Sequence, residues 1–116
     1  MRGAITCDED SKAEIEAKTA RLVKELFARN RLEHPDIVSI LFTTTHDLHA
    51  EFPARAARGA LGLDDVPLMG ALEQDVPGAI PRCIRVMVHC YTELGRHELQ
   101  HVFLEGATAL RPDLPQ

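Results

Sequence analysis

The chain has 116 residues, 45% of them hydrophobic, and a formal net charge of −5 at pH 7. This length fits one domain, residues 1–116, that can bury a core of its own. The negative charge argues against nucleic acid as a partner, and no apolar run approaches the length that spans a bilayer. No signal-peptide pattern opens the chain and its three cysteines form no CxxC pair, so we expect a cytoplasmic protein.

The first half of the chain predicts two strands around a helix. Residues 2–7 are expected to form a short strand. Ser11–Glu14 has the S-x-x-E pattern of a capping box, and the apolar residues that follow it recur at helical spacing. They predict a helix over residues 12–29. The β-branched and apolar run 37–44 then predicts a second strand.

The second half predicts one more helix and three strands. Phe52–Arg58 begins with a proline in its first turn and predicts a helix that Gly62 ends. Val66–Met69 predicts a short strand, and its proline indicates the edge of a sheet. After a Pro-Gly turn, residues 82–91 predict a long strand and residues 100–104 a further one.

These elements follow the order β-α-β-α-β-β-β, and residues 106–110 add a short helical turn. We therefore predict an α+β fold, in which a mixed five-strand sheet carries two helices on one face. Two helices cannot cover five strands completely, and this favours oligomerisation.

Arg85 is the most informative residue, because the surrounding run Cys83–Val88 otherwise has the pattern of a buried strand. Arginine stays protonated in proteins, and an unpaired buried charge is costly. The sequence leaves three explanations open: a strand face turned to water, an internal carboxylate, or an anionic ligand. Strand alternation places on one face Cys83, Arg85, Met87, His89 and Tyr91. Cys83 and His89 lie too far apart along that face for a Cys-His mechanism.

Other candidate residues carry weaker signals. Every basic residue after Lys24, histidine aside, is arginine, whose planar fork matches carboxylates and phosphates; a GC-rich gene explains this bias equally well. His46 and His49 lie near Glu51, but zinc needs three or four convergent ligands, so turn or interface histidines are favoured over a metal site. The chain contains no nucleophile or nucleotide-binding motif.

Several strings together carry a family resemblance. They are Arg2–Thr6, Thr45–Ala54 with its DLHxxFPA pattern, Cys83–Val86, and His101–Leu104 followed by Leu110–Leu114 with its LRPDL pattern. The chain resembles, over nearly its whole length, the monofunctional, trimeric, non-helical class of chorismate mutase typified by Bacillus enzymes. The resemblance implies a homotrimeric pseudo-α/β-barrel with active sites between subunits. It also implies rearrangement of chorismate to prephenate in aromatic amino-acid biosynthesis, without cofactor or metal.

The resemblance also implies roles for individual residues. Arg85 would bind the ether oxygen of the breaking bond and a carboxylate, Arg2 a substrate carboxylate, and Glu73 the ring hydroxyl. The expected substrate contacts are Phe52, Ala54, Arg55 and Arg58 at an entrance supplied by the neighbouring subunit, Leu68, Met69 and Gly70 as a wall, Phe103, and Leu110 with Arg111 as a C-terminal lid.

Three departures from the family pattern keep alternatives open. Phe103 stands where the family commonly has tyrosine, Gly70 where Bacillus enzymes have cysteine, and a start at Met1 would leave Arg2 on a short, frayable strand. The alternatives are a trimeric small-molecule binding or regulatory relative with little or no catalysis, and a RidA-type enamine deaminase. The two long strings argue against the deaminase, and Glu73 together with Arg85 argues against a protein that only binds.

Overall fold

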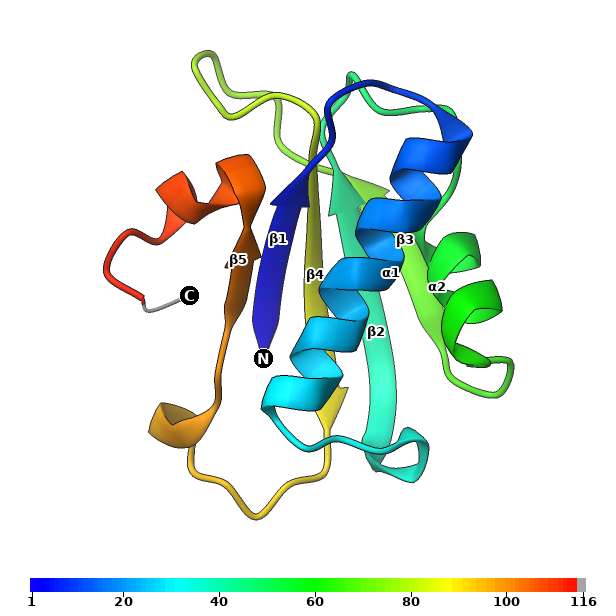
Figure 1. Ribbon diagram of the computed structural model, residues 1–116, viewed down its shortest axis with the longest axis vertical. Helices are drawn as coiled ribbons and strands as arrows, with labels where there is room; N and C mark the ends of the chain where they lie inside the picture. The colour runs from blue at the N-terminus through cyan, green and yellow to red at the C-terminus, as the bar shows by residue number, and fades with distance from the viewer. Residues whose placement is uncertain (115–116) are drawn as a thin grey trace.

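The computed structural model describes residues 1–114 as an α+β fold around one mixed sheet (Figure 1). The five strands lie in the order β3-β2-β4-β1-β5. Strand β4 runs antiparallel to β1 and β2, whereas β1 pairs with β5 and β2 with β3 in parallel. The elements are β1 (Arg2–Thr6), α1 (Lys12–Arg29), β2 (Ile37–Thr44), α2 (Pro53–Leu61), β3 (Leu68–Leu72), β4 (Cys83–Cys90) and β5 (Val102–Leu104), with short 3-10 turns η1 (His34–Asp36), η2 (Arg96–Glu98) and η3 (Glu105–Leu110).

Helix α1 has the predicted bounds, but its N-terminal cap differs from the prediction. The Ser11 hydroxyl accepts the Glu14 amide at 3.2 Å, which is one half of a capping box. The Glu14 carboxylate instead accepts the amide of Asp8 at 2.8 Å, so the reciprocal bond is absent and the preceding turn is fastened to the helix.

Helix α2 ends as predicted at Gly62, which has a φ of 65° in the left-handed region. Strand β3 occupies the predicted edge but begins two residues late. Pro67 cannot donate to the ladder; only its carbonyl takes part, accepting the Ile40 amide at 3.0 Å. The last two strands are also shorter at their ends than predicted, Cys83–Cys90 and Val102–Leu104.

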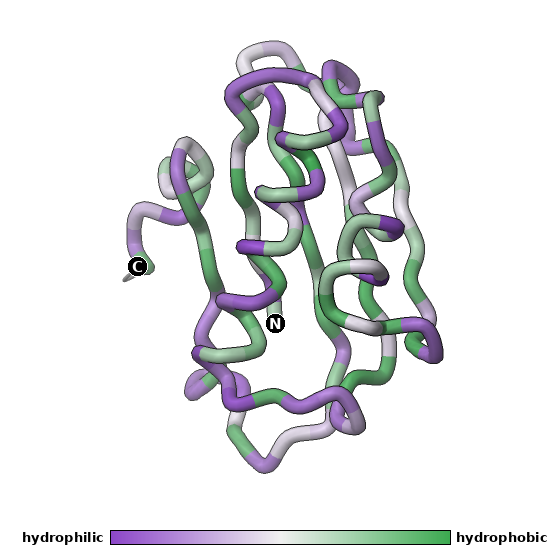
Figure 2. The backbone as a smooth tube through the Cα atoms, turned by 45° about the vertical axis from the view of Figure 1, so that its right-hand side comes forward, coloured by the Kyte–Doolittle hydropathy of each residue, from purple (hydrophilic) through white to green (hydrophobic). Residues whose placement is uncertain are grey.

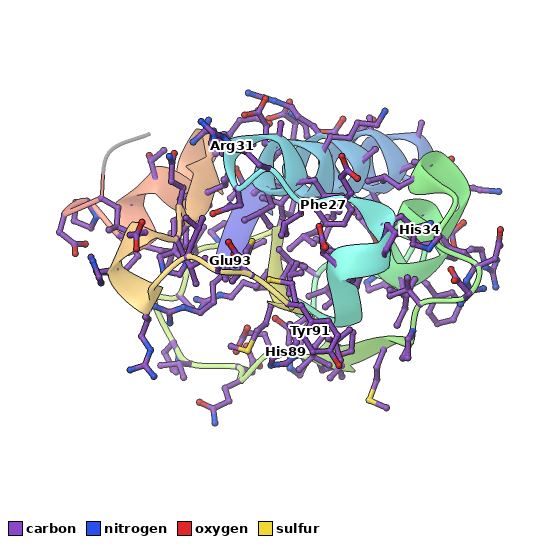
Figure 3. The ribbon with its side chains drawn as sticks, turned by 90° about the horizontal axis from the view of Figure 1, so that it is seen from below. Phe27, Arg31, His34, His89, Tyr91 and Glu93 are labelled. Carbon is purple, nitrogen blue, oxygen red and sulfur yellow. The ribbon has the colours of Figure 1, made fainter. Side chains whose placement is uncertain are left out.

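The core lies between the sheet and the two helices, which cover the same face (Figure 3). Ile84, Val86 and Val88 of β4 point into this core and are buried. Arg85 and Met87, which alternate with them, lie on the opposite face and are exposed. Figure 2 shows hydrophobic residues following the strands and hydrophilic residues in the loops at both ends. We call the two sides the helix-covered face and the open face.

Gly3 lets α1 pack closely across β1. A Cβ built at Gly3 would lie 2.6 Å from the Val102 carbonyl oxygen and 3.1 to 3.2 Å from methyl groups of Leu22 and Leu26. Any side chain here would push the helix or strand β5 away, so the absence of one sets the spacing of the layers.

A second, smaller cluster covers one end of the open face, where Ala4, Cys83 and Phe103 pack with Ala107 of η3. Elsewhere on this face Leu41, Met69 and Met87 remain exposed. No helix among residues 1–114 is long and apolar enough to cross a membrane.

Candidate functional site

Strand register gathers the predicted catalytic residues on the open face. Arg85 lies opposite Thr43 on one side and Ala4 on the other. In the next row, Met87 lies between Leu41 and Arg2. Directly opposite residues share a face of the sheet, so Arg2 and Arg85 point to the same side although 83 positions separate them in the sequence.

These residues line a cavity of about 320 Å³, which we call the arginine cavity. Strands β1, β2 and β4 form its floor, and η3 and the loop after β3 form its walls. Its lining includes all three predicted catalytic residues and three of the predicted substrate contacts: Arg2, Glu73, Arg85, Phe103, Leu110 and Arg111, together with Gly3, Leu41, Thr43, Val86 and Met87.

Arg85 and Glu73 form an ion pair in the lining of this cavity. The Arg85 Nε lies 3.4 Å from Glu73 Oε2, and the side chains are 45% and 25% exposed. The Thr43 hydroxyl donates to the same carboxylate oxygen at 2.7 Å. This bond, followed by the Gln74 amide and the Arg85 charge, lowers the pKa of Glu73 against the opposing effect of burial. Both structural explanations of Arg85 therefore apply: its strand face is open, and a carboxylate pairs with it.

Hydrogen bonds hold Arg2 in the sheet, beginning with the first residue of the chain. The Met1 ammonium donates to the Val88 carbonyl at 2.8 Å, and the Val88 amide donates to Met1. The Arg2 amide donates to Nδ1 of His101 at 3.0 Å. Burial and the nearby Arg2 charge lower the pKa of His101, which keeps this nitrogen an acceptor. The strand that carries Arg2 is short, as expected, and is hydrogen-bonded through its first residue.

The C-terminal segment closes one side of the arginine cavity with Leu110 and Arg111. The Arg111 guanidinium is bidentate to Asp113, with Nε and Nη2 at 3.0 and 2.8 Å from its oxygens. The base of the segment is fixed to α1, because Glu105 pairs with Lys18 and, at 3.3 Å, with Arg21. Leu110 and Arg111 therefore extend from a fixed point.

Four other predicted contacts lie in a different cavity. A pocket of about 680 Å³, which we call the α2 pocket, is lined by residues that include Phe52, Ala54, Arg55 and Gly70. The Arg55 guanidinium stacks on the Phe52 ring at 5.1 Å from its centroid and lies 3.5 Å from Glu51. Within one chain these residues do not line the arginine cavity.

The three remaining contacts also lie outside the arginine cavity. Leu68 and Met69 are neighbours on edge strand β3, so they face opposite sides of the sheet. Leu68 shares the helix-covered face with Gly70, and Met69 shares the open face with Leu41. Arg58 is exposed on α2. The predicted wall of Leu68, Met69 and Gly70 is thus divided between the two faces.

The histidine pair His46 and His49 is separated by its hydrogen bonds. The His46 Nε2–H donates to the Glu73 carbonyl at 2.9 Å, and His49 Nδ1 lies 3.0 Å from an Asp10 oxygen. Within residues 1–114 no three His, Cys, Asp or Glu side chains gather as a metal ion requires.

Sequence reasoning did not name as site residues five members of the cavity lining, or His101 next to Arg2; the five are Gly3, Leu41, Thr43, Val86 and Met87. Alternation placed Met87 on the face of Arg85, and alternation along 37–44 would have placed Leu41 and Thr43 on one face of their strand. Only the register between β2, β4 and β1 shows that those faces lie on the same side of the sheet, and the sequence of a single strand does not determine that register.

The comparisons with known proteins agree with one another. The family model for chorismate mutase type I matches residues 1–114. The chorismate mutase AroH of Bacillus subtilis is 40% identical over 114 residues, 98% of this chain and 90% of that protein. The AroH of Thermus thermophilus is 40% identical over 115 residues, 98% and 93% of the two chains. A solved chorismate mutase from Clostridium thermocellum superposes with a TM-score of 0.91 at 46% identity, covering 94% and 96%.

Proposed function

The chain belongs to the type I chorismate mutase family, and from this premise we propose that its arginine cavity rearranges chorismate to prephenate. The observation that carries the proposal is the charge of the cavity. Arg2, Arg85 and Arg111 line it, and Glu73 is the single carboxylate among the described residues of the lining. Chorismate is a dianion, and guanidinium groups suit its two carboxylates.

The reaction is an intramolecular rearrangement, so it needs no nucleophile and no proton transfer. Acceleration requires contacts that are stronger in the transition state than in the substrate. The ether oxygen gains negative charge as its bond to carbon breaks, and we assign Arg85 to it as the preorganised donor. We assign Arg2 to a substrate carboxylate.

Glu73 is assigned to the ring side of the substrate. Its carboxylate would accept a hydrogen bond from the ring hydroxyl and lie near the positive charge that develops on the ring. The lowered pKa of Glu73 keeps this group ionised at neutral pH. Phe103, buried in the cavity wall, supplies shape without the hydroxyl of a tyrosine.

We further propose that the active form is a homotrimer whose sites lie between subunits. Most of the expected site residues fall into two separate groups within the chain, one in the arginine cavity and one in the α2 pocket. A head-to-tail ring brings one group of each subunit against the other group of its neighbour. The exposed Leu41, Met69 and Met87 of the open face are an apolar surface that such a ring can cover.

The decisive test of the activity is the loss of chorismate absorbance with the purified protein, measured beside the Arg85→Ala variant. We expect steady loss with prephenate as the product, and a strongly reduced rate in the variant. Chorismate that binds in calorimetry without turnover would instead support the alternative of a binding or regulatory relative.

The shared site can be tested by mixing two defective variants. Arg85→Ala damages the arginine cavity, and Arg58→Glu reverses a charge on the neighbour's side. In a ring, roughly a quarter of the sites in randomly mixed trimers regain both intact halves. We expect activity to reappear when the two variants are unfolded together and refolded. Sites contained within one chain would give no recovery.

A further inference from the structure

We propose that Thr43 is a positioning residue for the reaction, whose hydroxyl holds the Glu73 carboxylate in the orientation in which it meets the substrate. The inference rests on the proposed function, because it takes Glu73 as part of the site. Nothing in the sequence pointed to Thr43, which is the last but one residue of the apolar strand β2.

The geometry singles out the hydroxyl as the nearest partner of the carboxylate. Thr43 Oγ1 donates to Glu73 Oε2 at 2.7 Å, whereas Arg85 Nε lies 3.4 Å from the same oxygen. A charge-assisted bond from a guanidinium is normally about 2.7–2.9 Å long. The arginine therefore pairs loosely with Glu73, and the threonine fixes the orientation of its carboxylate.

The backbone of Glu73 is fixed by separate contacts. Its amide donates to the Thr44 carbonyl at 2.8 Å, and its carbonyl accepts Nε2–H of His46 at 2.9 Å. With the main chain held at both groups, the remaining freedom of Glu73 lies in its side-chain torsions. Besides the hydroxyl, those torsions are limited by the looser Arg85 pair at 3.4 Å and by the Gln74 amide, which lies 3.3 Å from the other oxygen.

Thr43 also reaches the cavity from a rigid element. It lies opposite Arg85 of the central strand β4, on an inner strand of the sheet, and it lines the arginine cavity. Groups on central strands are held more precisely than groups on loops. Glu73 itself follows the last residue of edge strand β3. The hydroxyl therefore anchors a carboxylate that lies on a loop to a position fixed by the sheet.

The charged groups around Glu73 determine what a pH measurement can show. Arg85 faces it from β4, His46 and Asp75 lie in the adjoining loops, and Arg2 and Arg111 lie across the cavity. Among the influences on this carboxylate the Thr43 bond is the largest, and it lowers the pKa. Its removal should therefore raise the pKa, since the arginine charges stay in place.

The experiment compares Thr43→Val and Thr43→Ala, which lack the hydroxyl, with Thr43→Ser, which keeps it. Thr19→Val is the matched control, because it deletes a hydroxyl that is fully buried on α1 and is not part of the cavity lining. The measurements are kcat and KM, the acid limb of kcat/KM against pH, the carboxyl-carbon NMR titration of Glu73, and the thermal midpoint as a check of folding.

We expect Thr43→Val and Thr43→Ala to lower kcat at least about tenfold, the size of a lost hydrogen bond to a charged group. Their acid limb and the Glu73 titration should move to higher pH. Thr43→Ser and Thr19→Val should keep the wild-type values. A purely structural role would change the thermal midpoint without moving the titration.

The inference is overturned if the two hydroxyl-free variants keep the wild-type kcat and titration, or if Thr43→Ser is as impaired as they are. A wild-type protein without turnover would refute the proposed function instead. In that case the NMR titration still decides whether Thr43 holds the carboxylate, because it needs no substrate.

Discussion

The two faces of the sheet differ in how far the same chain covers them. On the helix-covered face, Ile84, Val86 and Val88 of β4 are buried by helices of the same chain. On the open face, the alternating Arg85 and Met87 of the same strand are exposed. Folding of a single chain therefore buries the helix-covered face, whereas the open face keeps charged and apolar side chains exposed.

This difference indicates how the chain divides its residues between stability and chemistry. Substitutions of buried core residues on the helix-covered face should change the free energy of unfolding and leave the reaction alone. Substitutions of charged residues in the arginine cavity should do the reverse. Each prediction below compares positions from the two sides, or from inside and outside the arginine cavity.

Arg85→Ala should have the largest effect. Loss of the donor at the breaking bond is expected to reduce kcat by about 10²–10³-fold. Arg55→Ala should reduce it less than about tenfold, because that side chain is 64% exposed and is not assigned to the reacting bond. Neither should shift the thermal midpoint strongly. The check is steady-state kinetics with calorimetry; near-wild-type kcat in Arg85→Ala would refute its assignment.

Gly3→Ala should destabilise the fold by about 1–3 kcal/mol, as overpacking does. The added methyl would lie 2.6 Å from a main-chain oxygen that cannot move easily. Gly70→Ala is the control for stability, because a Cβ there meets no atom within 4 Å. Urea unfolding of both variants tests this, and equal midpoints would contradict the close approach of α1 and β5 to Gly3.

Ile84→Val should cost about 0.5–1.5 kcal/mol of unfolding free energy, because it removes one buried methylene from the helix-covered face. Val38→Ala removes two carbons, more than the Ile84 substitution does, but from a side chain that is 41% exposed, and should still cost less. Both variants should keep the wild-type KM. A raised KM in Ile84→Val would mean that the two faces are coupled.

Acidification should have the smallest effect: the free energy of unfolding should change little until the pH falls to the usual pKa range of glutamate. Hydrogen bonding to Thr43 lowers the folded-state pKa of Glu73 below its ordinary 4.5. The stabilisation by this carboxylate is complete above the unfolded-state value and is lost as the pH falls through the folded-state value. The Glu73 titration measured in Thr43→Val should lie closer to the ordinary value; an unchanged titration would contradict this.

The elements of the fold followed from the sequence because their signals are local. Helical spacing after Ser11 gave the bounds of α1, and Gly62 gave the end of α2. The predicted start of β3 was wrong, because Pro67 cannot donate a ladder hydrogen bond although the apolar pattern of a strand continues on both sides of it. The cover of one face by both helices followed from packing rules and not from single residues, whereas the order of the strands in the sheet was not predicted.

The site was predictable only in part. Arg85 was found because a charge interrupts an apolar strand, and the family resemblance added Arg2 and Glu73. The contact between Arg85 and Glu73 depends on how β3 and β4 flank β2, which no local pattern reports. Thr43 carried no signal, because a threonine in a strand is ordinary until its cross-strand partner is known.

The alternation of buried and exposed residues along β4 also fixes the register of this strand against its neighbours. A slip of one position against β1 or β2 would carry Arg85 beneath α1 and turn Ile84 and Val86 outward. Such a misaligned chain would bury an unpaired charge and expose its best core residues, so it could not compete with the native pairing. The native register is therefore strongly favoured, because it leaves Arg85 in its cavity and Ile84 and Val86 in the core. For the same reason, a single-residue insertion or deletion within Cys83–Cys90 should destabilise the fold and displace the site together.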